Sequence, residues 1–197
     1  MISALKTYVG HLHGGLSVVT ILACMIFAAI SGSSPATAAA IGSIMIPGMV
    51  NAGYDKIYAM GLVAAAGTLG ILIPPSVPLI VYGVVAEESI GKLFMAGVLP
   101  GILLGTILII AAIVYARKHN YGGDSKATWK ERGQASVKAI WGAFLPFLIL
   151  GSIYTGICTP TEAAVVACFY TIIISAFIYR ELTWKDIRPI LRETVNI

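Results

Sequence analysis

The chain has 197 residues, of which 58% are hydrophobic and 11% are charged. Soluble domains carry roughly 25% charged residues, so this composition excludes an ordinary soluble domain and indicates an integral membrane protein. The formal net charge of +4 does not indicate nucleic-acid binding, because the basic residues lie in segments beside apolar stretches.

The first apolar block is interrupted by a short run of small residues. No charged residue or His occurs from Gly14 to Tyr54, and Ser31–Pro35 divides this block into two arms. The second arm, residues 36–50, is too short to cross a hydrocarbon core of about 30 Å comfortably. We therefore predict a re-entrant helical hairpin over residues 14–50 with its tip near mid-membrane. Two short full spans joined by an external turn also fit the pattern.

The second apolar block, residues 57–86, is too long to be one straight span. As a continuous helix it would extend about 45 Å, at ~1.5 Å per residue. Gly67–Ser76 holds Gly67, Gly70 and two adjacent prolines, and these residue types interrupt helices. The sequence predicts a broken helix whose unwound stretch lies at the depth of the hairpin tip.

Three further apolar helices are predicted, at residues 93–116, 139–157 and 160–179. The positive-inside rule places the basic loop 117–138 and the tail 180–197 in the cytoplasm, together with the N-terminus and the turn at residues 51–56. Glu87, Glu88 and the turn before the last helix then face the other side. Thr159–Glu162 has the pattern of a capping box, so we interpret Glu162 as a helix cap rather than a proton carrier.

The two interruptions are the candidate binding stretches. Broken helices at membrane depth leave unpaired carbonyl and amide groups and typically mark the ion and substrate sites of secondary transporters. Uncharged oxygen ligands favour Na⁺ over a divalent or transition metal. The candidate Na⁺ ligands, mostly through backbone oxygens, are Ser31, Gly32, Ser33, Ser34, Gly67, Thr68 and Gly70. The candidate substrate contacts are Ser33, Ser34, Pro35, Thr68, Pro74, Pro75 and Ser76.

Motifs of several enzyme classes are absent from the sequence. It contains neither a P-loop nor a G-x-S-x-G nucleophile turn, and no His lies within an apolar span to activate a serine. Its three cysteines fit no metal-binding spacing. We therefore predict that the chain is not an enzyme and needs no cofactor besides Na⁺ as a coupling ion.

Four sequence segments together resemble one family of membrane proteins. They are SGSSPATAA at Ser31–Ala39, GSIMIP at Gly42–Pro47, AAAGTLGILIPPS at Ala64–Ser76 and TPTEAA at Thr159–Ala164. The chain resembles the large membrane subunit of tripartite ATP-independent periplasmic (TRAP) transporters, and the resemblance extends over essentially its whole length. By position, the hairpin tip and the broken helix match the family's cation site and one side of its substrate site.

The resemblance implies an all-α integral membrane fold, the elevator fold of the ion-transporter superfamily, of which this chain forms about half of the inverted repeat. Residues 1–91 would hold half of the transport domain, and residues 92–197 the connecting and scaffold helices. We find no second hairpin or second broken helix, so we expect a central fragment, from either a truncated reading frame or a split subunit.

The resemblance further implies Na⁺-coupled secondary active import of an organic acid, of the C4-dicarboxylate or sialic-acid type. The expected location is the inner membrane of a bacterial cell, as a multi-pass protein in the lipid bilayer. The expected protein partners are a periplasmic substrate-binding protein and a small membrane subunit. Two alternatives stay open: a dicarboxylate/Na⁺ elevator transporter that needs no binding protein, and a non-transporting scaffold whose breaks only permit helix packing.

Overall fold

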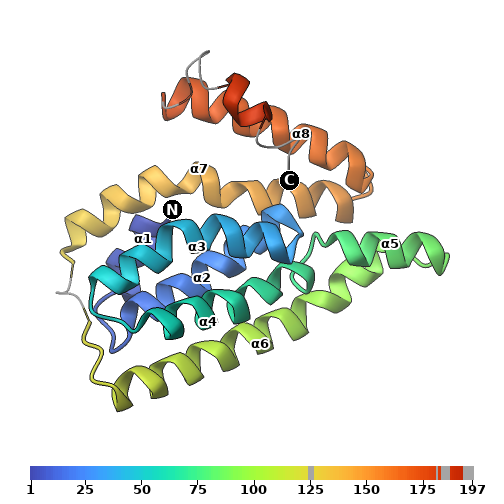
Figure 1. The fold of residues 1–197 in the computed structure, drawn as a ribbon. Helices are drawn as coiled ribbons and strands as arrows, with labels where there is room; N and C mark the ends of the chain where they lie inside the picture. Colours follow the sequence, from blue (N-terminus) through green and yellow to red (C-terminus); the bar gives the residue numbers. More distant parts are fainter. Residues whose placement is uncertain (124–126, 181, 183–186, 193–197) are drawn as a thin grey trace. The chain divides into compact units, whose positions relative to one another are not determined.

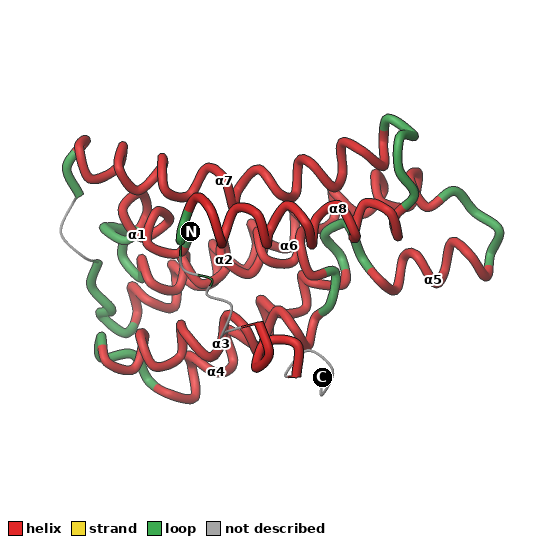
Figure 2. The backbone as a smooth tube through the Cα atoms, turned by 90° about the horizontal axis from the view of Figure 1, so that it is seen from above, coloured by secondary structure: helices red, strands yellow, loops and turns green. Residues whose placement is uncertain are grey.

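The computed structural model in Figure 1 describes residues 1–197 except 124–126, 181, 183–186 and 193–197, and except the side chain of Lys138. The described residues form helices and no strands, which confirms the predicted all-α class. The chain divides into two compact units, residues 1–146 and residues 147–197. The helices and their short connections are also visible in the second view (Figure 2).

A helical hairpin occupies the first predicted block. After the short helix α1 (Ile2–Val9), helix α2 (Gly15–Ser31) and helix α3 (Ser34–Asn51) run side by side in opposite directions (Figure 1). Gly32 ends α2 with φ 63°, in the left-handed region that glycine adopts without a steric penalty. Pro35 lies in the first turn of α3, where a missing N–H costs nothing. The tip therefore falls at the residues that the sequence predicted.

The second block contains two helices separated by an irregular stretch. Helix α4 (Lys56–Gly67) continues into the 3₁₀ turn η1 (Thr68–Ile71), and helix α5 (Val77–Val85) begins after Ser76. Asp55 starts α4 by accepting a hydrogen bond on Oδ1 from the Tyr58 amide at 2.8 Å. The Ser76 hydroxyl donates to the Ile71 carbonyl across the unwound residues at 2.7 Å.

Helix α6 (Ile90–Lys118) packs through a row of glycines. A Cβ atom added at Gly97 would lie 2.8 Å from the Leu72 carbonyl oxygen, and one at Gly101 would lie 2.7 Å from Cγ1 of Ile73. A Cβ atom at Gly105 would lie 2.6 Å from Sδ of Met25 in α2. This row of glycines therefore lets α6 approach the break and α2 closely, as stripes of small residues do in membrane helices.

The core of the first unit lies among α2, α3, α4 and α6. Ile21, Cys24, Met49, Ala59 and Ala66 are fully buried within it. These residues follow the apolar faces that the four helices turn toward one another, and α2 supplies many of the buried side chains because it contacts each of its neighbours.

A stack of aromatic rings joins three chain segments at one end of the first unit. The Tyr58 and Tyr115 ring centroids are 4.2 Å apart, and those of Tyr54 and Tyr121 are 4.3 Å apart. The Tyr121 carbonyl accepts from the Gly14 amide at 3.1 Å. The start of α2, the turn before α4 and the end of α6 therefore meet at one end, as the charge distribution predicted.

Helix α7 (Trp129–Tyr154) is bent by 49° between residues 129–137 and 139–154. Helix α8 (Pro160–Ile173) is prolonged by a π-helical turn, η2 (Ile174–Ile178). By length and composition, Ile90–Lys118 and Pro160–Ile178 are each able to cross a membrane, and the bent α7 is a third candidate span. These helices correspond to the three later spans that the sequence predicted.

The predicted capping box at the start of α8 is confirmed. The Thr159 amide donates to Oε2 of Glu162 at 2.8 Å, and the Glu162 amide donates to the Thr159 hydroxyl at 3.3 Å. The backbone amides of Thr159 and Glu162 each donate to a side-chain oxygen of the other residue, which supports the interpretation of Glu162 as a cap.

Replacing Thr159 with alanine is expected to destabilise the first turn of α8 by about 1 kcal/mol, because the Glu162 amide loses its acceptor. Hydrogen exchange of the first α8 amides should then become about fivefold faster, since about 1 kcal/mol corresponds to that ratio. Thr161→Ala is the matched control, since Thr161 is not the residue that caps α8. Equal exchange in the two variants would contradict the cap.

Candidate functional site

The hairpin tip lies directly against the unwound stretch. The Val77 amide, at the start of α5, donates to the Gly32 carbonyl oxygen at 3.1 Å. A Cβ atom at Gly32 would stand 2.6 Å from the Pro75 carbonyl oxygen. The structure therefore brings together the two stretches that the sequence singled out separately. Because Gly32 combines a positive φ with this close approach, no other residue type fits here without strain.

A second contact joins the start of α3 to the 3₁₀ turn. A Cβ atom at Gly70 would lie 2.6 Å from the Ser33 carbonyl oxygen and 2.8 Å from Oγ1 of Thr37. A Cβ atom at Gly67 would lie 2.9 Å from Cβ of Ala38. Both glycines therefore have a packing role that the structure shows, while a role in cation binding stays a prediction.

Two carbonyl oxygens of the tip already accept hydrogen bonds within the chain. The Ser33 carbonyl accepts from the Thr37 amide at 3.0 Å, from the Thr37 hydroxyl at 2.8 Å and from the Ser31 hydroxyl at 3.4 Å. The Gly32 carbonyl accepts from Val77, as described above. A cation that uses either oxygen must therefore share it with an internal donor or replace that donor.

The predicted substrate contacts differ in accessibility. Pro35 and Thr68 are exposed, whereas Pro74 and Ser76 are buried. Ser33, Ser34 and Pro75 are partly exposed. The Thr68 hydroxyl donates back to the Ala65 carbonyl at 2.7 Å. Ser76 and Pro74 therefore support the unwound stretch from within, and the exposed or partly exposed residues are the ones open to a ligand.

Thr37 is a residue of the site that sequence reasoning missed. Its side chain is fully buried, and its hydroxyl holds the Ser33 carbonyl at the tip. The signal was present, because a threonine four residues after a helix start often donates to the carbonyl one turn earlier. Val77 was missed as well, and its long-range bond to Gly32 left no local signal.

Four helix ends meet at this site. The carboxyl end of α2 and the end of the 3₁₀ turn present carbonyl groups, which carry partial negative charge. The amino ends of α3 and α5 present amide groups, which carry partial positive charge. Among the described residues, no cluster of His, Cys, Asp and Glu is suited to a metal ion. The site therefore brings together partial negative charge from carbonyl groups and partial positive charge from amide groups.

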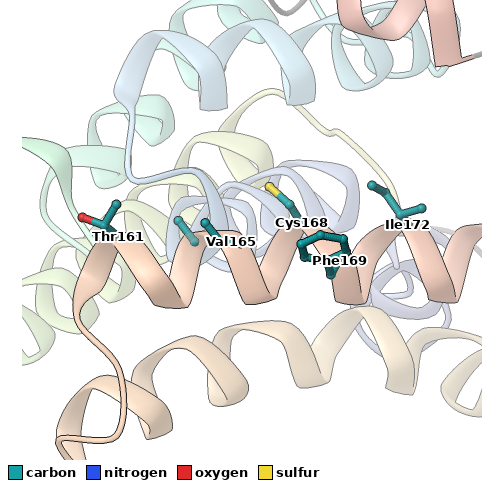
Figure 3. A pocket seen from close by; sticks show the side chains of 6 residues that line it. Thr161, Val165, Cys168, Phe169 and Ile172 are labelled. Carbon is teal, nitrogen blue, oxygen red and sulfur yellow. The ribbon is translucent and has the colours of Figure 1, made fainter.

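A hollow on the second unit differs from this site in having an apolar lining. It measures about 320 Å³ and lies along one face of α8, between Thr161 and Ile172 (Figure 3). Val165, Cys168 and Phe169 also line it, and its wall is almost entirely apolar. Such a surface suits lipid chains or another helix, and its lining residues include no charged group to bind a carboxylate.

Replacing Gly70 with alanine is expected to destabilise the contact between the tip and the break. The added methyl group would overlap the Ser33 carbonyl oxygen, and overpacking of this kind costs about 1–3 kcal/mol. Gly61→Ala is the matched control, because its Cβ would meet nothing within 4 Å and alanine is the better helix former. Thermal unfolding in detergent should show a lower Tm for Gly70→Ala only. Equal Tm values for both variants would contradict the contact.

Comparisons with known proteins agree with this architecture. Residues 1–197 match the family model described as the DctM component of the tripartite ATP-independent periplasmic transporter. The chain is 48% identical over 186 residues to the C4-dicarboxylate TRAP transporter large permease protein of Pseudomonas aeruginosa, covering 94% of this chain and 44% of that protein. It is 52% identical over 174 residues to the corresponding protein of Vibrio cholerae, covering 88% of this chain and 38% of that protein.

A relative with a different named substrate also matches. The ectoine/5-hydroxyectoine TRAP transporter large permease protein of Ruegeria pomeroyi is 37% identical over 194 residues, covering 98% of this chain and 45% of that protein. The chain thus spans less than half the length of each of these three relatives. These proteins are transporter permeases rather than enzymes. On the full-length family match and these identities, the chain belongs to the DctM family of TRAP transporter large permease components.

Proposed function

We propose that this chain forms part of the membrane subunit of a Na⁺-coupled secondary transporter that imports organic acids. The observation that carries the proposal is the contact between the hairpin tip and the broken helix, where Val77 donates to the Gly32 carbonyl. This contact gathers helix ends of both polarities among apolar helices. In a membrane, such a place combines affinity for a cation with affinity for a carboxylate.

The cation part of the proposal rests on the oxygens of the tip. Carbonyl and hydroxyl groups at Ser31, Gly32, Ser33 and Thr68 are neutral hard ligands, which suit Na⁺. Remaining proposed ligands are Ser34, Gly67 and Gly70. Because the Ser33 carbonyl already holds the Thr37 hydroxyl, Na⁺ binding there involves a rearrangement of this local bond.

The substrate part rests on the amino ends of α3 and α5. Ser34 and Pro35 begin one helix, and Ser76 precedes the other, so amide groups at both helix starts point toward the contact region. The named relatives carry C4-dicarboxylates or ectoine, and each of these molecules contains a carboxylate. We therefore propose a small organic acid as the substrate, of the C4-dicarboxylate or sialic-acid type.

Transport also requires parts that lie outside this chain. The curated relatives are more than twice as long as the matched segment, so we propose that their remaining portion completes the substrate site. The proposed partners are a periplasmic binding protein that delivers the substrate and a small membrane subunit, in the bacterial inner membrane. For the elevator movement, we propose that α6 travels with the hairpin instead of belonging to the scaffold helices expected for residues 92–197, because Gly97 and Gly101 pack against the break.

The test is a chimera in which this chain replaces the matched segment of the C4-dicarboxylate permease of Pseudomonas aeruginosa, expressed with that organism's partner proteins. Cells should take up labelled succinate when Na⁺ is present and lose uptake when choline replaces it. Omitting the binding protein should abolish uptake. Uptake without the binding protein would favour the binding-protein-independent alternative, and no uptake by a correctly inserted chimera would favour the scaffold alternative.

Within that chimera, the double variant Ser34→Ala/Thr68→Val is expected to raise the Na⁺ concentration for half-maximal uptake about tenfold or more. A lost bond to a charged group costs about 1.5–3 kcal/mol, which corresponds to that range. Ser43→Ala is the matched control, because Ser43 is an exposed residue of α3 whose hydroxyl donates to the Ala40 carbonyl, away from the tip. Unchanged Na⁺ dependence at normal surface abundance would refute these two hydroxyls as ligands.

A further inference from the structure

Arg132 lies between two aromatic rings at the basic end of the first unit. Its guanidinium carbon is 5.7 Å from the ring centroid of Tyr8 in α1 and 5.4 Å from that of Trp129 in α7. Both distances are within the range of a cation–π contact. The Tyr8 hydroxyl also forms a hydrogen bond of 2.7 Å with the Ser136 hydroxyl, which fastens α1 to the first part of α7.

The Nε atom of Arg132 is buried and has no hydrogen-bond partner within the described chain. A buried donor without an acceptor costs free energy, and none of the described residues supplies an acceptor to this atom. A guanidinium held by aromatic faces presents its N–H groups in one plane, which matches the oxygens of a phosphate group.

The surroundings of Arg132 carry mostly positive charge. This end of the unit, where α1, the turn before α4, the end of α6 and the start of α7 meet, holds the described basic residues Lys6, Lys56, Arg117, Lys118, Lys130 and Arg132. Its described acids are Asp55 and Glu131. Both carboxylates accept hydrogen bonds at helix starts, Asp55 from the Tyr58 amide and Glu131 from the Thr128 amide. The field at this end therefore attracts an anion.

The first part of α7 has the character of an interfacial helix. Trp129 is 84% exposed and Val137 is 69% exposed, on a segment that also carries Lys130 and Arg132. The helix then bends by 49° into the apolar residues 139–154. An exposed aromatic ring beside basic residues, followed by a bend into an apolar segment, is typical of a helix at the membrane surface.

We propose that Arg132, held in place by the Tyr8 and Trp129 rings and assisted by the charge of Lys130, binds the phosphate of an anionic phospholipid headgroup. A lipid fits better than a soluble anion, because the exposed Trp129 and Val137 require an apolar neighbour beside the charged group. The basic end is on the side that the positive-inside rule assigns to the cytoplasm, and the cytoplasmic leaflet carries the anionic lipids. The proposal is independent of the transport site, since it uses the opposite end of α2.

The experiment measures Trp129 fluorescence of the full chain in vesicles, with Trp141 and Trp184 replaced by phenylalanine. Brominated phosphatidylglycerol or brominated phosphatidylcholine serves as the quencher. If the site selects an anionic headgroup, quenching should show that phosphatidylglycerol occupies the position beside Trp129 about fivefold more readily than phosphatidylcholine. This is the ratio expected for one basic residue near the surface. Arg132→Gln should abolish the preference, and Arg132→Lys should retain part of it.

Lys92→Gln is the matched control, because Lys92 is an exposed basic residue at the start of α6, at the other end of this long helix. It should leave the preference unchanged. Circular dichroism establishes that each variant is folded, and Arg132→Lys keeps the positive charge beside Tyr8 if Arg132→Gln is unstable. Equal quenching by the two lipids would overturn the proposal, and so would a preference that survives Arg132→Gln or that is lost equally in Lys92→Gln.

Discussion

The close approach of the hairpin tip to the unwound stretch is the contact on which the first unit depends. Gly32 and Gly70 make it possible, because a side chain at either position would overlap a backbone oxygen. With the tip in this position, the Gly32 carbonyl accepts a hydrogen bond from the Val77 amide. Helices α2, α3 and α4 run between this contact and the aromatic stack at the other end of the unit. The two glycines thus permit this arrangement of the helices, because a larger residue at either position would force the backbone apart.

A break of this kind is stable in an apolar environment only if its backbone groups find partners. The structure supplies these partners both from neighbouring residues and from residues distant in the chain. The Ser76 hydroxyl donates to the Ile71 carbonyl within the break, and Gly32 accepts from Val77 across the contact. Helix α6 then covers the unwound residues through Gly97 and Gly101. Irregular backbone is therefore enclosed by protein on several sides, while Pro35, Thr68 and Ile71 are exposed.

What the sequence could predict depends on how local each signal is. The breaks, the tip, the glycine stripe and the capping box are written in neighbouring residues, and the structure contains all of them. The bond from Val77 to Gly32 joins residues far apart in the chain, so periodicity and composition hold no trace of it. The sequence also does not show whether an oxygen already accepts hydrogen bonds. By residue type, the Ser33 carbonyl is a natural cation ligand, yet the hydroxyl groups that donate to it are identified only by the structure.

The hydrogen bonds that the Ser33 carbonyl already accepts would link ion binding to conformation. If Na⁺ takes the Ser33 carbonyl, the hydroxyl of Thr37 must share that oxygen or release it, and Thr37 is fully buried against Gly70. A cation at the tip would therefore alter the packing between α3 and the 3₁₀ turn, and the start of α5 is bonded to the same tip through the Val77 amide and the Gly32 carbonyl. Under the proposed function, coupling of a cation to an organic anion would need no charged side chain at the site. The ion would change the donor arrangement that positions the neighbouring helix ends, and affinity for a carboxylate would follow from that arrangement.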